Sequence, residues 1–392
     1  KAIEFIDIGG PSMARAAAKN YHSVVSLCNP SNYSKFMEIY DINSGDISIE
    51  YRKQLASNVF AMTMAYESSI YKYFIDDNDP MPEFISLQLE KTANLRYGEN
   101  PHQCAAFYVS NGNNLNWEQH QGKTLSYNNY ADMETAINIV LEFSKIACVI
   151  IKHANPCGFG LGKNLKEAYT RAVSTDPISY FGGIVGFNVE VNSDVAIELI
   201  KPFLECIIAP SFSDNALEIL KKKKNLRLIS TKNLTMNEKC IIKSVAGGYL
   251  YQERDLHHGN LTDFDIVTTN KPNELESLAI QLGWKIVKYV KSNAIVFADS
   301  RQLLGVGAGQ MSRIDSVKIA IQKMVDSGLN LDGAVMASDA FFPFSDCVEI
   351  AAAAGITAII QPGGSIKDEE VIKRANELGL SMMFTKTRHF LH

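Results

Sequence analysis

Residues 147–158 read ACVIIKHANPCG, and the rest of the chain is organised around this stretch. The run from Ala147 to Ile151 is apolar and rich in β-branched residues, which predicts a buried strand. Turn-forming residues follow it. The strand is therefore expected to end in a loop in which Pro156 restricts Asn155 and Gly158 lets the chain turn.

Two titratable residues, Lys152 and His153, lie where this strand ends. In open α/β sheets, ligands bind outside the carboxyl ends of the strands, so both side chains are placed for acid–base chemistry. The alternative is a solvated lysine beside a capping histidine, because titratable groups gather at functional sites only statistically. The neighbouring motifs favour the functional interpretation.

The order of elements around this stretch recurs later in the chain. A strand, a glycine-bearing turn, a helix, a strand, a helix and a strand are predicted across residues 147–210 and again across 293–362. The two series close alike, with IIAPSF and IIQPGG. Two copies of one α/β unit are therefore predicted. The second turn, GVGAGQ at 305–310, fails the dinucleotide pattern GxGxxG because Gln310 takes the last position, although its backbone could still cradle a ligand.

The first eighty residues predict a different arrangement. A short strand ends at Asp7, a helix begins at the glycines after it, and a second strand covers Val24–Ser26 before a long helix at 51–74. Free backbone N–H groups at the start of the first helix favour an anion site, and a plain helix start is the equal alternative. The composition of Asp76–Pro82 predicts a linker and the first domain boundary.

Composition excludes several classes of protein. The 392 residues suffice for two or three domains, and a net charge of -5 does not favour nucleic acid as a partner. Seven scattered cysteines without a CxxC pair indicate a reducing compartment. The sequence contains no apolar stretch of about eighteen residues and nothing like a signal peptide, so a cytoplasmic protein without a membrane partner is expected.

A zinc deaminase is a rival interpretation of the central stretch. The stretches His153-Ala154-Asn155 and Pro156-Cys157 are similar to fragments of the deaminase signature, H-x-E and P-C-x-x-C. Asn155 stands where the essential glutamate would be, and Gly160 stands where the second cysteine would be. A zinc ion would lack its ligands, so no metal is expected, and a metal-dependent nucleobase deaminase is kept as an alternative.

Taken together, the motifs resemble those of the bifunctional purine biosynthesis enzymes, which join AICAR formyltransferase to IMP cyclohydrolase. The matching motifs, in the order of that family, are IDIGGPSMARAAAKN, LRYGENPHQ, SYNNYAD, KHANPCG, DPISYFGGIVGFN, IIAPSFSDNAL, SNAIV, GVGAGQMSRIDS, SDAFFPFSD, IIQPGGSIKD and RHFLH. The resemblance covers almost the whole chain.

The resemblance implies an α/β fold in three parts. Residues 1–80 would be the C-terminal part of a Rossmann-like (MGS-like) cyclohydrolase domain with a linker helix. Two duplicated cytidine-deaminase-like subdomains would follow at 92–255 and 265–392, forming the formyltransferase. The chain would then begin near the last third of the cyclohydrolase domain, and ring closure is expected only where the preceding segment is also present.

The resemblance also implies a reaction. The chain would transfer the formyl group of 10-formyltetrahydrofolate to AICAR, and the cyclohydrolase would close the product FAICAR to IMP. His153 matches the base, Lys152 the group that stabilises developing charge, and Asn293 the residue that contacts the formyl group. Asp7 and Lys19 match a catalytic pair of the cyclohydrolase. A non-catalytic nucleotide-binding fragment is the remaining alternative.

Binding residues carry over from the family in the same way. Those expected around AICAR are Arg96, Tyr97, His102, Asn129, Phe181, Gly182, Glu205 and Arg388, with the two arginines on its phosphate. Those expected around the folate are Ile178, Phe341, Pro343, Phe344 and Asp346. A homodimer with active sites shared between subunits is implied, without a tightly bound cofactor. Cys157 is expected to be a packing residue, and the sequence leaves open whether K+ binds near Ser292.

Overall fold

The computed structural model describes residues 1–75, 79–110, 115–231, 239–257, 259–331 and 333–392. The chain divides into two units. The first unit comprises residues 1–92, 108–114 and 239–253, and the second comprises 93–107, 115–238 and 254–392. Each unit is described by itself below.

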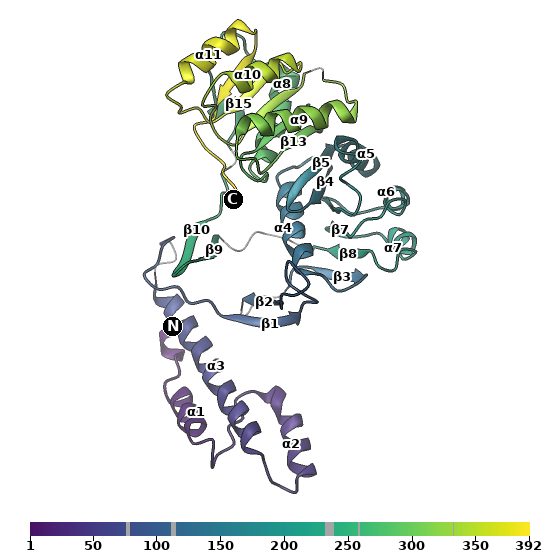
Figure 1. Ribbon diagram of the computed structural model, residues 1–392. Helices are drawn as coiled ribbons and strands as arrows, with labels where there is room; N and C mark the ends of the chain where they lie inside the picture. Colours follow the sequence, from purple (N-terminus) through teal and green to yellow (C-terminus); the bar gives the residue numbers. More distant parts are fainter. Residues whose placement is uncertain (76–78, 111–114, 232–238, 258, 332) are drawn as a thin grey trace. The chain divides into compact units, whose positions relative to one another are not determined.

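Helices form most of the first unit (Figure 1). They are α1 (Gly9–Lys19), α2 (Tyr33–Ile42) and α3 (Ile49–Phe74), with short 3-10 turns at Ala2–Phe5 and Pro30–Asn32. α1 packs on α3 through a small buried cluster that contains Ala18, Ala56 and Val59. The long helix is confirmed, and it begins where Ser48 accepts a hydrogen bond from the Tyr51 amide over 3.2 Å.

The two strands predicted near the start of the chain are wrong. Residues 2–5 form a 3-10 turn, and Val24–Ser26 has no regular structure. A strand needs a neighbouring strand for its backbone hydrogen bonds, and the described residues 1–75 contain none. Of the predicted linker, residues 76–78 lie outside the described part of the chain.

The chain also forms two two-stranded sheets. β1 (Leu89–Asn94) pairs with β2 (Ala106–Ser110). β9 (Cys240–Val245) pairs antiparallel with β10 (Gly248–Glu253), from Gly248 opposite Val245 to Glu253 opposite Cys240.

The second unit contains two six-stranded mixed sheets, which confirms the α/β class. The first has the order β3 (Glu118–Gln121), β8 (Arg227–Ser230), β7 (Cys206–Ala209), β6 (Ile184–Phe187), β4 (Ala147–Lys152) and β5 (Asn155–Leu161). The second has the order β11 (Asp265–Ile266), β16 (Ser381–Phe384), β15 (Ala358–Gln361), β14 (Val335–Ser338), β12 (Ile295–Ala298) and β13 (Leu303–Gly307).

The strand directions repeat from one sheet to the other. In each sheet, three neighbouring strands are parallel, and the strands on both sides of them run antiparallel. The helices of the first copy are α4 (Tyr127–Leu141), α5 (Leu165–Thr175), α6 (Ser193–Leu199) and α7 (Asp214–Leu220). Those of the second are α8 (Glu274–Val287), α9 (Arg313–Ser327), α10 (Asp346–Ala353) and α11 (Asp368–Glu377). The predicted internal repeat is therefore present.

The predicted glycine-bearing turns are partly wrong: Gly158 lies in strand β5, and residues 305–307 of the second turn lie in strand β13, while residues 308–310 follow that strand. Gly158 lies in β5 opposite Ile150, and Gly307 lies in β13 opposite Ile295. A Cβ added to Gly158 would stand 2.0 Å from the Ala172 carbonyl oxygen of α5. A Cβ on Gly307 would likewise stand 1.9 Å from a carbonyl oxygen of α9. These glycines allow a helix backbone to lie against a strand backbone, which is a packing requirement and not a turn signal.

The two copies share one apolar core. A single buried cluster includes Ile139 of α4, Trp284 of α8 and strand residues of both sheets. Burial of each large apolar side chain contributes roughly 1.5–3 kcal/mol. The copies also meet through the backbone, because Leu161 at the end of β5 donates to the Arg301 carbonyl over 2.7 Å, beside a bridge between Gly160 and Gln302.

Within the described part of the chain, no helix is both long and apolar enough to cross a membrane.

Candidate active site

A cleft of about 930 Å³ lies at the ends of several strands of the first six-stranded sheet. It is lined by Asn94, Leu95, Arg96, Tyr97, Gly122, Lys123, Thr124, Ser126, Asn128, Asn129, Asp132, Lys152, His153, Gly182, Phe203, Leu204, Glu205, Asn225 and Arg227. Seven of the residues predicted from the sequence are therefore together: Arg96, Tyr97, Asn129, Lys152, His153, Gly182 and Glu205.

The sequence predicts a site at the carboxyl ends of the strands, and among the strands next to the cleft only β4 fits this prediction. β4 presents its carboxyl end to the cleft through Lys152, as the sequence predicts. β4 is antiparallel to β6, and β6, β7 and β8 are parallel to one another. The cleft therefore lies at the amino ends of these three strands, where residues 182, 203–205 and 225–227 precede or begin them.

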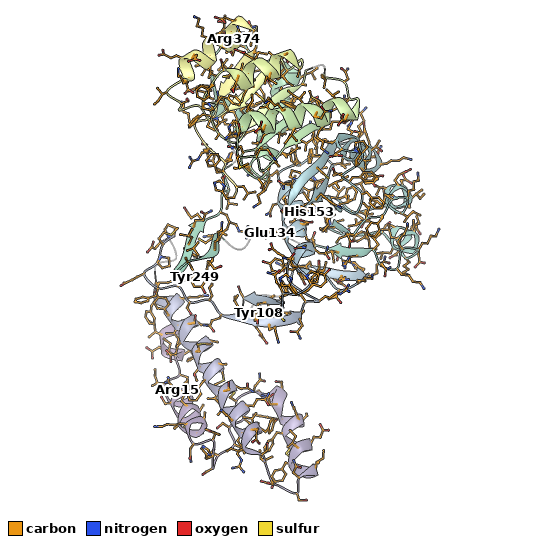
Figure 2. The ribbon with its side chains drawn as sticks, in the orientation of Figure 1. Arg15, Tyr108, Glu134, His153, Tyr249 and Arg374 are labelled. Carbon is orange, nitrogen blue, oxygen red and sulfur yellow. The ribbon has the colours of Figure 1, made fainter. Side chains whose placement is uncertain are left out.

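Lys152 and His153 belong to a tight hairpin between β4 and β5 and not to a loop (Figure 2 labels His153). Lys152 pairs with Asn155, which leaves only His153 and Ala154 between the strands. Their φ angles are +52° and +57°, the combination found in type I′ hairpins. Pro156 is tolerated because β5 is an edge strand. The turn leaves the His153 side chain exposed at its tip.

The Lys152 ammonium is held against the loop before β6. Its Nζ donates to the Phe181 carbonyl oxygen over 2.7 Å. A Cβ on Gly182, whose φ is +68°, would stand only 3.2 Å from Nζ. A larger residue at position 182 would therefore crowd the lysine out of this place.

The start of α4 lines the cleft. Ser126 caps the helix, and Asn129 completes a capping box through hydrogen bonds of 3.0 and 3.2 Å. A helix N-terminus attracts anions through its dipole and its unpaired N–H groups. With Arg96, Lys123 and Lys152 nearby in the same cleft, the arrangement suits a phosphate.

Asp132, one turn further along α4, is a site residue that the sequence prediction missed. Its Oδ1 accepts a hydrogen bond from the Ala154 amide over 2.6 Å. Burial raises the pKa of Asp132, and the Ala154 bond and the charges of His153 and Lys152 oppose this only in part. A signal was available, since residues 129 and 132 are three apart in a helix and share one face.

Arg227, at the start of β8, is a second missed residue. It donates to Glu205 Oε2 over 2.7 Å and to the Thr124 carbonyl over 3.2 Å, and it is 8% exposed. An arginine inside an apolar run such as NLRLIS must be paired when it is buried, and this could have indicated its role. The pair holds the Glu205 carboxylate at the cleft.

Asn293 lies outside the cleft lining but is connected to the hairpin that carries His153. Asn155 Oδ1 accepts the Lys291 amide over 2.9 Å, two residues before Asn293. The Asn293 side chain accepts from Arg313 over 2.8 Å and donates to the Gln310 carbonyl over 2.9 Å. Arg313 in turn forms a buried ion pair with Asp339, which also accepts from Ser292 Oγ over 2.6 Å. Asn293 is therefore held in one orientation.

The remaining predicted binding residues do not line the cleft of this chain. They are His102, Ile178, Phe181, Phe341, Pro343, Phe344, Asp346 and Arg388. Phe344 is 58% exposed, and Arg388 lies over the Phe390 ring at 4.4 Å. Ile178 is also exposed, in the loop that follows α5.

Asp7 and Lys19 are not brought together. Asp7 accepts the Gly10 amide over 2.9 Å before the first turn of α1, and Lys19 is the last residue of that helix. At a rise of 1.5 Å per residue, the two ends lie on the order of 15 Å apart. The expected role of Asp7 and Lys19 as a cyclohydrolase pair stays a prediction.

Burial raises the pKa of Cys157 to about 12, so this residue is a thiol at neutral pH. Its Sγ lies 3.5 Å from the Ile150 carbonyl oxygen. Among the described residues, no group of three or more His, Cys, Asp or Glu side chains is arranged to hold a metal ion.

Comparison with known proteins accounts for this combination of motifs and fold. The profile of the AICARFT/IMPCHase bienzyme family matches residues 17–323. The chain belongs to this family. The bifunctional purine biosynthesis protein PurH of Halalkalibacterium halodurans is 48% identical over 401 residues, which cover 100% of this chain and 77% of that relative.

Two further relatives agree with this assignment to the bienzyme family. PurH of Lysinibacillus sphaericus is 49% identical over 396 residues, and PurH of Caldicellulosiruptor saccharolyticus is 48% identical over 401 residues. In both cases the match covers 100% of this chain and 77% of the relative.

Proposed function

We propose that the cleft of the second unit binds AICAR and transfers to it the formyl group of 10-formyltetrahydrofolate. The observation that carries this proposal is the joint presence of Lys152, His153 and a cationic helix-start pocket in one cleft. The family joins this activity to IMP cyclohydrolase, and both serve purine biosynthesis.

The chemistry requires a base and a stabilised charge. The 5-amino nitrogen of AICAR attacks the formyl carbon, a C–N bond forms, and the bond from that carbon to the folate nitrogen breaks. His153 accepts the proton that the amine loses, and the departing folate nitrogen gains a proton. Lys152, fixed by the Phe181 carbonyl, stabilises the negative charge that develops on the formyl oxygen. Asn293 contacts the formyl group in this proposal.

Recognition of the nucleotide follows from the walls of the cleft. Arg96 and the start of α4 take the phosphate, because a guanidinium fork and free N–H groups both suit an anion. Tyr97, Asn129, Gly182 and Glu205 surround the rest of AICAR. His102, Phe181 and Arg388 complete this side in the proposal.

The folate side involves a second copy of the chain. Ile178, Phe341, Pro343, Phe344 and Asp346 would form the pterin pocket, with apolar walls and one carboxylate. Since these residues do not line the cleft of their own chain, we propose a homodimer in which each active site draws on both subunits. Sedimentation of the purified protein, with and without AICAR, tests this point.

The finer fold assignments belong to the same proposal. We assign each six-stranded copy to the cytidine-deaminase-like topology and residues 1–80 to the end of a Rossmann-like cyclohydrolase domain. The protein works in the cytoplasm without a tightly bound cofactor. A role for K+ near Ser292 is tested by comparing formyl transfer in K+ and in Na+.

The decisive experiment is a formyl-transfer assay on the purified protein with AICAR and 10-formyltetrahydrofolate. We expect saturable turnover that is abolished in His153→Ala and retained in the control His22→Ala, which changes an exposed histidine of the first unit. AICAR binding without turnover would favour a non-catalytic nucleotide-binding protein. Stoichiometric zinc by elemental analysis, with ammonia release from a nucleobase, would favour the deaminase.

A further inference from the structure

The hairpin tip that carries His153 is held in a conformation its residues do not prefer. His153 and Ala154 both have a Cβ, yet their φ angles are +52° and +57°. For residues other than glycine, the Cβ atom makes this region sterically unfavourable. Contacts from outside the turn must therefore stabilise it.

Two side chains satisfy the backbone of this tip. Asp132 Oδ1 accepts a hydrogen bond from the Ala154 amide over 2.6 Å. Asn155 Nδ2 donates to the His153 carbonyl over 3.1 Å. The first contact joins the tip to α4, whose opening turns form a wall of the cleft.

We infer that Asp132 is a positioning residue: through the Ala154 amide it fixes the turn that presents the His153 imidazole to the substrate. This inference rests on the proposed role of His153 as the base. Asp132 acts here as a hydrogen-bond acceptor for the backbone. Its negative charge is not what the turn requires.

Two variants distinguish a role of Asp132 as a hydrogen-bond acceptor from a role of its charge. Asp132→Ala removes the acceptor and should lower kcat for formyl transfer about tenfold to a hundredfold, with KM for AICAR changed much less. Asp132→Asn keeps an amide oxygen at the same place and should retain most of the activity. Equal damage in the Asn and Ala variants would overturn the inference, because it would show that the charge acts on the substrate.

A rescue experiment tests the turn itself. Glycine adopts positive φ without strain, so Ala154→Gly in the Asp132→Ala background should restore part of the kcat lost in Asp132→Ala. Absence of any rescue, with all variants folded, would contradict a role through the turn. If Asp132→Ala does not fold, the Asn variant and the double variant still decide the question.

Amide hydrogen exchange distinguishes this inference from the proposed function. The Ala154 N–H should exchange slowly in the unchanged protein and in Asp132→Asn, and faster in Asp132→Ala. If His153→Ala left formyl transfer intact, the role of His153 would be wrong, but the exchange result would still report on the turn. Unchanged exchange in Asp132→Ala would overturn the positioning role even if formyl transfer is established.

Discussion

The backbone amide of Lys291 donates a hydrogen bond to Asn155 Oδ1 over 2.9 Å and so joins the His153 hairpin to the segment before Asn293. His153 and Asn293 are the two groups expected to meet the formyl carbon. His153 belongs to the first copy of the repeat, and Asn293 belongs to the second. A single asparagine side chain connects them, because its other atom, Nδ2, bonds to the His153 carbonyl.

Asn155→Ala should therefore lower kcat about tenfold or more, because it removes both hydrogen bonds of this side chain, to the Lys291 amide and to the His153 carbonyl. Asn155→Asp keeps the oxygen that accepts from Lys291 and loses only the donor to His153, so its effect should be smaller. Steady-state kinetics on the two variants provide the measurement. Equal kcat values for both would show that the Lys291 bond contributes nothing.

Lys152→Ala should reduce formyl transfer by roughly 10²- to 10⁴-fold, as the loss of a positioned catalytic group typically does. The side chain is not part of the apolar core, so the melting temperature should hardly change. Single-turnover measurements at saturating substrates are the test. Near-normal kcat in a folded Lys152→Ala protein would remove this residue from the mechanism.

Arg388→Ala should mainly raise KM for AICAR, because a phosphate contact acts about equally on the ground state and the transition state. Arg374→Ala is the matched control, since Arg374, which Figure 2 labels, lies on α11. It forms surface ion pairs with Glu349 and Glu377. The control should leave kcat and the KM for AICAR unchanged. A defect confined to kcat in Arg388→Ala would point to a positional role instead.

Gly158→Ala should destabilise the second unit by about 1–3 kcal/mol or more, because the new Cβ would lie 2.0 Å from the Ala172 carbonyl oxygen. Gly248→Ala is the control, as nothing lies within 4 Å of its added Cβ. Denaturant titration followed by circular dichroism compares them. A Gly158→Ala protein as stable as the control would mean that α5 can move away from β5 freely.

The Asp176–Lys323 pair should give the protein part of its resistance to acid. Burial alone would raise the pKa of Asp176, but hydrogen bonds from Lys323, at 2.7 Å, and from Ser179 outweigh burial and lower it. The unfolded pKa is about 3.9. The contribution is therefore complete above that value and is lost as the pH falls through the lower folded pKa.

Asp176→Asn should make the free energy of unfolding depend less on pH in the acid range. Near neutral pH it should lower that free energy by about 1–2 kcal/mol. The effect is small because the Lys323 side chain is 40% exposed, so that solvent screens the pair. Free energies of unfolding measured from about pH 2 to about pH 7, a range that includes the titration of carboxyl groups, provide the comparison. Parallel curves for the two proteins would contradict the assignment of this pKa shift.

Much of the second unit could be predicted because the same order of strands and helices occurs twice in the sequence. Apolar runs such as residues 147–151 marked the buried strands, and the recurrence of the same series marked the duplication. β5 and β13 were missed since their glycines have a packing reason that depends on a helix elsewhere in the chain. Close approach of α5 to Gly158 is a tertiary fact, and local patterns do not contain it.

The candidate site was predictable where residues lie in a distinctive motif and not where they act through others. Lys152 and His153 follow directly from the end of a strand. Asp132 matters because it reaches the Ala154 amide, and Arg227 because it holds Glu205. Such partners become visible only when the fold brings together residues that are 22 positions apart in both cases.

The contact between Leu161 and Arg301 has a consequence for how a duplicated protein can change. The turn between β4 and β5 and the turn between β12 and β13 are equivalent by strand order. The first holds His153 at a cleft, while the second, at residues 299–302, docks onto the far end of β5. The two equivalent turns therefore have different surroundings, since the first lines the cleft and the second packs against the other copy. The second is constrained by its sister copy, and a change there would alter the assembly before it altered the chemistry.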